Sequence, residues 1–253
     1  MSETRKNPEE AKVSASPYIR QPPQGGWQKP PSSPYIRQTP QGGWQKPPER
    51  EIVHQGTIEG FGTWALDENG LLTIDGKGDM PDWKAEYRYR DGVGWVTTAP
   101  WGLLKKSIQS AHLASGITRI GDEAFEDCRS LTNIRIPSSV TSIGSWAFYG
   151  CSSLESITIP GSVTSIGSWA FKDCSSLTNI AIPNSVTSIG RHAFYGCSSL
   201  KSITIPGSVT SIGDGAFSGC YSLKSVVMPR RFETNRLTFR RRYSLRKSIV
   251  TFI

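Results

Sequence analysis

Apolar positions recur every 23 residues along the second half of the chain, without a slip in register. Each copy begins with an aliphatic residue and then carries Ile-Gly, Ala-Phe, Cys, Ser-Leu and a final Pro. The copies cover 117–139, 140–162, 163–185, 186–208 and 209–231. A fixed period of roughly 20 to 50 residues is typical of solenoids and other repeat arrays. We therefore expect each copy to form one coil of a stack.

The alternation of apolar and polar residues within one copy predicts a short β-strand. In the segment SLESITIP, the Leu and the two Ile have the spacing that turns three side chains inward, so Ser156 and Thr158 face outward. Gly144 allows a tight corner, Phe148 of the Ala-Phe pair fills the core from one helical turn, and Pro160 ends the strand. No copy can bury its apolar side alone. Stacked copies can, with strands pairing in parallel about 4.8 Å apart.

The order Ile-Pro, Val-Thr-Ser-Ile-Gly, Ala-Phe and Cys-Ser-Leu is matched five times over residues 117–229. It resembles the signature of the BspA-like (Treponema-type) leucine-rich repeats. The resemblance implies a leucine-rich repeat solenoid of short parallel β-strands joined by short helical or irregular turns. Members of that family are typically surface-exposed or secreted proteins of bacteria and some protozoa, implicated in adhesion to proteins of a host or neighbouring cell. No binding residue is implied, because the shared motif is the core of the repeat.

The region 51–116 predicts a β-rich cap for the N-terminal end of the array. Within it, the segment 63–76 places strand-like residues on both sides of Asn69 and Gly70, which is a strong signal for a β-hairpin. The aromatic residues that follow offer enough apolar surface to cover the end of a neighbouring core. An irregular half-coil begins near Ser107, as expected of a terminal repeat.

Residues 1–50 predict a disordered segment. Two near copies of 17 residues, 17–33 and 34–50, are dominated by Pro, Gly and Gln and offer one Trp and one Tyr each. That apolar area is too small to offset the entropy of ordering the chain. The Pro pairs favour polyproline II conformation, so the segment is either a flexible spacer or a ligand for an aromatic-lined groove.

The net charge of +8 is unevenly distributed along the 253 residues. Lys and Arg minus Asp and Glu gives +4 for 1–50, −3 for 51–229 and +7 for 230–253. The folded region therefore lacks the basic face expected of a nucleic-acid-binding domain. No run of about 18 apolar residues occurs, so no transmembrane segment is expected, and the polar N-terminus shows no secretory signal.

All five cysteines occupy one repeat position, which suggests at first a disulfide or metal ladder. They are Cys128, Cys151, Cys174, Cys197 and Cys220. Equivalent side chains of stacked coils point the same way, which keeps their Cβ atoms too far apart for a disulfide, and no His lies at zinc-finger spacing. We expect buried free thiols and no metal or cofactor. His54, His112 and His192 belong to no nucleophile-bearing motif, so no enzymatic activity is expected.

Positions that differ between copies are the candidates for recognition, because an array keeps its core fixed. A column just before Ala-Phe and the positions three residues on carry large rings: Trp146, Trp169, His192, Tyr149 and Tyr195. The outward positions of the strands give a second, more polar candidate surface: Arg135, Thr158 and Thr204. Trp and Tyr are frequent interface hot spots, but these rings could equally lie along the solenoid and cover neighbouring coils. The sequence leaves open which surface binds.

Residues 230–253 do not continue the repeat. They hold eight Lys and Arg and four aromatic residues, which is typical of a tail that binds a membrane surface or a polyanion. Out-of-frame sequence after a truncation would look the same. Without a proper cap, the last strand near 226–228 is expected to leave an open edge through which the chain could self-associate.

These expectations combine into a non-enzymatic protein-protein interaction module. The resemblance favours a cell-surface or secreted, adhesin-like protein that binds host or neighbouring-cell proteins. The missing export signal favours instead a cytoplasmic scaffold that joins one partner through the Pro-rich repeats and another through the solenoid. A binder of polyanions or membrane surfaces through the basic tails is the third alternative. No nucleic acid partner is expected for the folded region.

Overall fold

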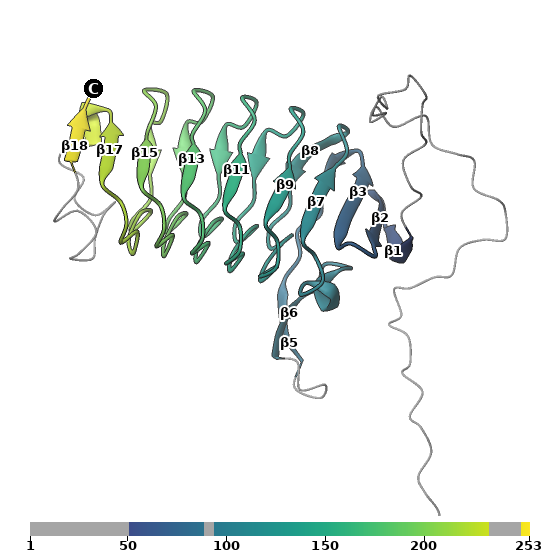
Figure 1. Cartoon of the computed structure of the whole chain (residues 1–253). Helices are drawn as coiled ribbons and strands as arrows, with labels where there is room; N and C mark the ends of the chain where they lie inside the picture. Colours follow the sequence, from purple (N-terminus) through teal and green to yellow (C-terminus); the bar gives the residue numbers. More distant parts are fainter. Residues whose placement is uncertain (1–50, 89–93, 233–248) are drawn as a thin grey trace, which may run out of the picture. The chain divides into compact units, whose positions relative to one another are not determined.

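The computed structural model describes residues 51–88, 94–232 and 249–253, and these form a solenoid of stacked coils (Figure 1). The Pro-rich segment 1–50 and residues 233–248 of the basic tail lie outside the described residues. The solenoid expected from the 23-residue period is confirmed, and so is the leucine-rich repeat form that the family resemblance implied, with strands of successive coils paired in parallel.

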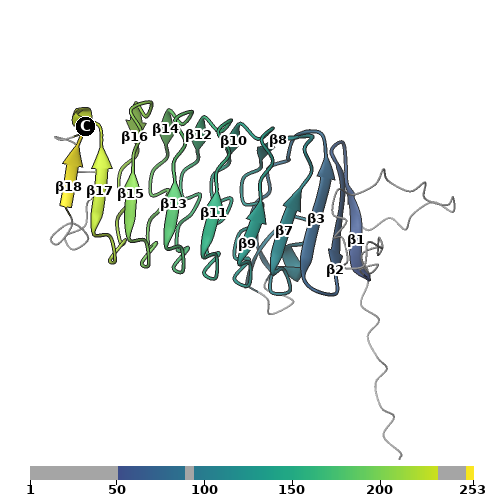
Figure 2. The same cartoon turned by 45° about the horizontal axis from the view of Figure 1, so that its top comes forward.

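Each full coil contributes one long and one short strand (Figure 2). The long strands are β7 (Ser110–Leu113), β9 (Asn133–Arg135), β11 (Ser156–Thr158), β13 (Asn179–Ala181), β15 (Ser202–Thr204) and β17 (Ser225–Met228). The short strands are β8 (Ile117–Ile120), β10 (Ser142–Ile143), β12 (Ser165–Ile166), β14 (Ser188–Ile189) and β16 (Ser211–Ile212). Equivalent residues pair between coils, as Ile157 with Ile180 and Ile143 with Ile166.

Alternation along the long strands follows the pattern expected from the sequence. In β9, β11, β13 and β15 the middle Ile is buried and both of its neighbours are exposed. Successive side chains of a strand point to opposite sides, so each coil turns one Ile into the core and two residues to solvent.

The segment between the short and the long strand is a run of turns and not a helix. The helical turn expected at Ala147 and Phe148 does not form, and the described residues contain no α-helix. The reason is hydrogen bonding between coils: the backbone N–H of Phe148 donates to the carbonyl of Ala170 in the next coil, at 2.8 Å. Left-handed backbone at Trp146 and Gly150, with φ of 59° and 70°, also interrupts any right-handed helix.

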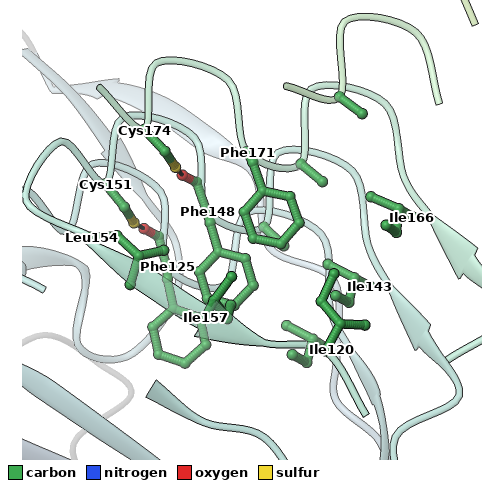
Figure 3. Packing of buried hydrophobic residues seen from close by; sticks show 14 of the residues in the cluster. Ile120, Phe125, Ile143, Phe148, Cys151, Leu154, Ile157, Ile166, Phe171 and Cys174 are labelled. Carbon is green, nitrogen blue, oxygen red and sulfur yellow. Dashed lines mark hydrogen bonds between the residues drawn. The ribbon is translucent and has the colours of Figure 1, made fainter. Parts of the chain in front are cut away.

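A continuous stack of phenylalanine rings runs along the interior (Figure 3). It consists of the Phe of each Ala-Phe pair: Phe125, Phe148, Phe171, Phe194 and Phe217. Neighbouring ring centres lie 5.2 to 5.3 Å apart, the planes are within 8° of parallel, and every ring is buried. Each ring therefore covers the ring of the next coil.

Three antiparallel strands cover the N-terminal end: β1 (Ile52–Ile58), β2 (Gly62–Asp67) and β3 (Leu71–Gly76). The hairpin between β2 and β3 turns at Asn69 and Gly70. There the Asp67 carboxylate accepts hydrogen bonds from the backbone N–H groups of Asn69 and Leu71, at 2.9 and 2.8 Å. Because β3 pairs in parallel with β7, this cap continues the long strands of the array.

Three indole rings close the core at the same end. Trp101 continues the phenylalanine stack at 6.1 Å from Phe125, and its indole N–H donates to the carbonyl of Ala124 at 2.8 Å. Trp64 and Trp83 meet Trp101 edge to face, at 6.1 and 5.2 Å. The remaining elements of this region are β4 (Gly78–Asp79), β5 (Ala85–Arg88), β6 (Gly94–Thr97) and the 3-10 helix η1 (Gly102–Leu104).

A strand from the basic tail closes the other end. β18 (Ile249–Phe252) pairs in parallel with β17, with Val250 opposite Val226, and Val250 and Phe252 pack against the core. Two expectations were therefore wrong: the tail does return to the array, and the edge at 226–228 is not open.

The long strands and the strands that cap them form two sheets, in the orders β1-β2-β3-β7-β9 and β11-β13-β15-β17-β18. The short strands and β4 form one sheet, in the order β16-β14-β12-β10-β8-β4.

The sequence does contain a signal for this last strand. Ser244 and Leu245 repeat the Ser-Leu that precedes each long strand, and β-branched and aromatic residues follow them. Val250 minus Val226 gives a spacing of 24 instead of 23, so a search at the strict period misses it. Between the two strands, the 3-10 helix η2 (Arg230–Phe232) places the Arg231 guanidinium where it donates to the carbonyl of Gly207, at 2.9 Å.

Replacing Phe171 by Ala should lower the free energy of unfolding by about 3 to 5 kcal/mol, because the cavity lies between two stacked rings. Urea unfolding followed by circular dichroism measures the change. The control Tyr221→Ala removes a ring that is 70% exposed and should cost less than about 0.5 kcal/mol. Equal costs for the two variants would show that the stack does not stabilise the solenoid.

Val250→Asp should release β18 from β17, because it places a carboxylate where the strand packs against the core. The exposed edge of β17 should then pair between molecules. We expect a lower melting temperature and concentration-dependent association in size-exclusion chromatography with light scattering. Thr251→Asp alters an exposed residue of the same strand and should change neither property. A monomeric, fully stable V250D would contradict the capping role.

Candidate binding surfaces

Five of the residues predicted for recognition form one cluster across three coils, which we call the aromatic cluster. Trp146 and Trp169 stack at 5.1 Å with an interplanar angle of 16°, and Trp169 and His192 stack at 4.1 Å with an angle of 12°. Tyr149 meets Trp146 edge to face at 5.1 Å, and Tyr195 meets His192 at 5.4 Å. All five side chains are half-buried.

Left-handed backbone positions the rings of this cluster. The φ angle is 59° at Trp146, 62° at Trp169 and 54° at His192, and the same position has 58° at Glu123 and 64° at Gly215. Such a conformation costs a residue with a Cβ atom roughly 1 to 2 kcal/mol. Because Glu123 adopts it without a ring, the hydrogen bonds between coils hold this conformation, as from the Trp146 N–H to the carbonyl of Ser168 at 3.0 Å. A Cβ atom at Gly215 would lie 2.7 Å from His192 Nε2, so the backbone there covers the end of the stack.

Lys172 lies in the middle of the aromatic cluster. Its Nζ is 4.7 Å from the ring centre of Tyr149, 5.1 Å from that of Trp169 and 5.7 Å from that of Tyr195. It also pairs with the Asp173 carboxylate at 3.5 Å, and its side chain is only 19% exposed. Lys172 holds the same repeat position as Tyr149 and Tyr195, but the sequence could not show that it contacts three rings. Neighbouring side chains therefore cover much of the ring surface. These contacts favour the interpretation that the rings cover the coils over the interpretation that they bind a partner.

The three remaining predicted residues belong to the other candidate surface. Arg135, Thr158 and Thr204 are the exposed last residues of β9, β11 and β15. We call the outward residues of four successive strands the long-strand face: Asn133, Arg135, Ser156, Thr158, Asn179, Ala181, Ser202 and Thr204. Most of these side chains are small, so the face is flat.

The eight predicted residues therefore make two surfaces and not one. The long-strand face belongs to the long strands, whereas the aromatic cluster lies in the turns that follow the short strands. The sequence could not decide which of the two surfaces binds a partner, because the spacing of residues does not show which rings are covered by their neighbours.

A groove along the short strands was not predicted. Its volume is about 560 Å³, and it is lined by the Ile-Gly pairs of successive coils and by two columns of polar residues. One column holds Arg119, Ser142, Ser165, Ser188 and Ser211, and the other holds Asp122, Ser145, Ser168 and Arg191. The signal in the sequence was the Ser of each Val-Thr-Ser-Ile-Gly. This Ser is the same in four copies, so it does not stand out among the positions that vary between copies.

The cysteine column is a structural feature, as expected. All five thiols are free and buried, and the Cys151 thiol donates to the carbonyl of Phe125 at 3.1 Å. Burial raises the pKa of the Cys128 and Cys220 thiols to about 12 and raises that of the others as well. The thiols therefore stay protonated and unreactive near neutral pH. In the described ranges, no three His, Cys, Asp or Glu side chains group so as to hold a metal ion.

Glu126 occupies the position that Tyr149 and Tyr195 hold in later coils. It is 8% exposed, and its Oε2 atom has no hydrogen-bond partner among the described residues. Burial and the nearby carboxylates of Glu123 and Asp127 together raise the pKa of Glu126 to about 7, against the opposing effect of the Lys105 ammonium group. The side chain therefore changes charge close to neutral pH.

Comparison with known proteins identifies the family. A model of the BspA type leucine rich repeat region matches residues 104–224 with six copies. A T. pallidum leucine rich repeat protein of known crystal structure is 32% identical over 67% of this chain and 80% of that chain, with a TM-score of 0.49. The chain belongs to the BspA-type leucine-rich repeat family, and its family and fold are those of a protein-interaction module.

The chain is also similar to two other proteins of known structure. A leucine-rich repeat protein from Bacteroides ovatus is 30% identical over 71% of this chain, with a TM-score of 0.51, and the match spans 46% of that chain. A leucine rich cell surface protein from Faecalibacterium prausnitzii is 27% identical over 70% of this chain and 55% of that chain, with a TM-score of 0.41. No curated protein matches the sequence. Within the described residues, no helix has the length and apolar character needed to cross a membrane.

Stability should fall as the pH rises from about 4.5 to about 7 and then level off, as far as Glu126 determines it. The pKa of Glu126 in the folded chain, about 7, lies above the 4.5 of an ordinary glutamic acid, so the folded state keeps a proton that the unfolded state has lost between these values. Glu126→Gln should therefore melt at a higher temperature than the unaltered chain at pH 8, with the gain shrinking toward pH 5. Asp214→Asn, which removes an exposed carboxylate, is the control and should show no such pH-dependent gain. A constant E126Q effect across this range would contradict the shifted pKa.

Proposed function

We propose that the chain is a non-enzymatic module that binds a partner protein through its long-strand face, at a cell surface. The observation that carries this proposal is the regular alternation on four successive strands. Each has an identical buried Ile between two exposed residues, and the exposed pair differs between neighbouring coils. A fixed frame with variable outward positions is the usual basis of recognition in repeat proteins.

The exposed hydroxyl groups on this face are available to a partner. The Thr158 and Thr204 side chains form no hydrogen bond within the part of the chain that the structure describes. By contrast, Thr132 and Thr178 donate to carbonyls of the preceding coil, at 3.0 and 3.3 Å. The first pair is thus free to bond to another protein, while the second pair joins the coils.

The aromatic cluster is less suited to binding than the long-strand face, because neighbouring side chains cover part of its rings. Stacking covers both faces of Trp169 and one face each of Trp146 and His192, and Lys172 lies between the two tyrosines. A partner would meet fewer free ring faces there than the sequence suggests, and ring edges offer less apolar area than ring faces. The long-strand face needs no such rearrangement to receive a partner.

Location at a cell surface, with a role in adhesion, rests on the family. Members of the BspA-type family are typically surface-exposed or secreted, and the partner would then be a protein of a host or neighbouring cell. Protease treatment of intact cells, followed by detection of the chain, tests this location. Complete protection, together with recovery in the cytosolic fraction, would favour the intracellular scaffold instead.

Thr158→Arg combined with Thr204→Arg should weaken binding to a surface-protein partner at least about tenfold, because two bulky cations would stand on a flat face. Biolayer interferometry with the full chain and a panel of purified surface proteins measures the loss. Asp214→Arg is the matched control: it also raises the net charge by two, at an exposed residue beyond the short strands, and should bind as the unaltered chain does. Binding that survives T158R/T204R but is lost with D214R would refute the assignment to the long-strand face.

A further inference from the structure

We propose that the groove along the short strands is a second binding site and that its ligand is a linear, neutral polysaccharide. The chain of sugars would lie along the solenoid axis, with one sugar beside each coil. This site is separate from the long-strand face, so either proposal can fail without the other.

The hydroxyl groups in the groove have no partner within the described residues, unlike those of the neighbouring columns. The Ser142, Ser165, Ser188 and Ser211 side chains line the groove and make no hydrogen bond there. The adjacent residues are engaged: the hydroxyl groups of Thr141, Thr164, Thr187 and Thr210 donate to the carbonyl of the preceding coil at 3.1 to 3.2 Å. A serine hydroxyl both donates and accepts, as sugar hydroxyls do. The groove therefore offers a ladder of groups that match those of a carbohydrate.

The charges around the groove favour a neutral ligand. Arg119 at one end donates to the carboxylates of Asp82 and Asp122, so its charge is compensated. The Asp122 carboxylate also accepts a hydrogen bond from the backbone N–H of Ser145, at 2.9 Å. Among the charged residues of the lining, Arg191 alone has no ion pair within the described residues. The rest of the lining consists of serines, glycines and isoleucines. A polyanion would need several such cations.

The spacing of the groove favours a polysaccharide over a peptide. Its lining repeats with each coil, because Ser142, Ser165 and Ser188 pair in register along parallel strands. Such strands lie about 4.8 Å apart, whereas an extended peptide advances about 3.3 Å per residue and falls out of step. A sugar ring linked through opposite corners is about as long as the spacing of the coils. Each unit of a linear glycan can therefore meet an equivalent set of hydroxyls.

The shape of the groove is fixed before any ligand arrives. A Cβ atom at Gly167 would lie 2.5 Å from the backbone of Gly144, and one at Gly190 would lie 2.4 Å from that of Ser168, so packing between coils sets the depth of the floor. A rigid site loses little conformational entropy on binding.

Two tryptophans adjoin the lining in the sequence. Trp146 and Trp169 directly follow Ser145 and Ser168, two residues of the lining. Both rings are half-buried, and their indole N–H groups make no hydrogen bond to the described part of the chain. Each indole N–H is therefore an unbonded donor one residue away from the lining.

Binding of β-1,4-linked hexasaccharides of glucose and of N-acetylglucosamine to the full chain, measured by isothermal titration calorimetry, tests the proposal. At least one should bind, and its affinity should rise from the disaccharide to the tetrasaccharide as more coils are occupied. Ser165→Leu with Ser188→Leu should weaken binding at least about tenfold, because two leucines fill the groove. The control, Ser156→Leu with Ser202→Leu, makes the same change on the long-strand face and should leave sugar binding intact.

Three results would overturn the proposal. One is the absence of binding by either hexasaccharide at millimolar concentration. Another is binding that S165L/S188L leaves unchanged while its circular dichroism spectrum and melting temperature remain those of the unaltered chain. The third is tighter binding of an extended peptide of Ser and Asn, lost in the same variant, which would assign the groove to a polypeptide.

Discussion

The structure depends on the covering of each coil by the next. A coil of 23 residues has too little interior to surround its own apolar side chains, so the Phe of one coil lies face to face with the Phe of its neighbours, at 5.2 to 5.3 Å. Strand pairing imposes nearly the same spacing, about 4.8 Å. Because both interactions require equivalent residues to lie above one another, every column of the repeat is brought into register.

This constraint explains several features that look functional in the sequence. The left-handed backbone at Trp146, Trp169 and His192 recurs at Glu123, which has no ring, and at each of these residues the backbone N–H donates to a carbonyl of the next coil. Four of the five cysteine thiols donate to carbonyls within the interior, and all five are buried and stay protonated. Turn N–H groups donate to the following coil, which is why the Ala-Phe segment does not close into a helix. In each case, contact between coils decides what a residue does.

The same constraint creates two ends that must be covered. At the N-terminal end, β3 extends the long strands and Trp101 extends the phenylalanine stack. At the C-terminal end, β18 pairs with β17 although its sequence departs from the repeat. Between the ends, the long-strand face varies from coil to coil while the short-strand groove hardly changes. A variable face suits recognition of a particular protein, and a constant groove suits a ligand that is itself a repeat.

The sequence by itself determined the architecture, since a strict 23-residue period of apolar residues can be satisfied only by stacking. It also determined that the cysteines pack as thiols, because equivalent side chains point the same way. Tertiary structure alone decided the return of the tail as β18, the contact of Lys172 with three rings, and the unengaged hydroxyls of the groove. Apart from the contact of Lys172 with Trp169, these features arise between coils, where the residues involved are 23 or more positions apart. Local spacing shows which way a side chain points, but not which neighbour it meets.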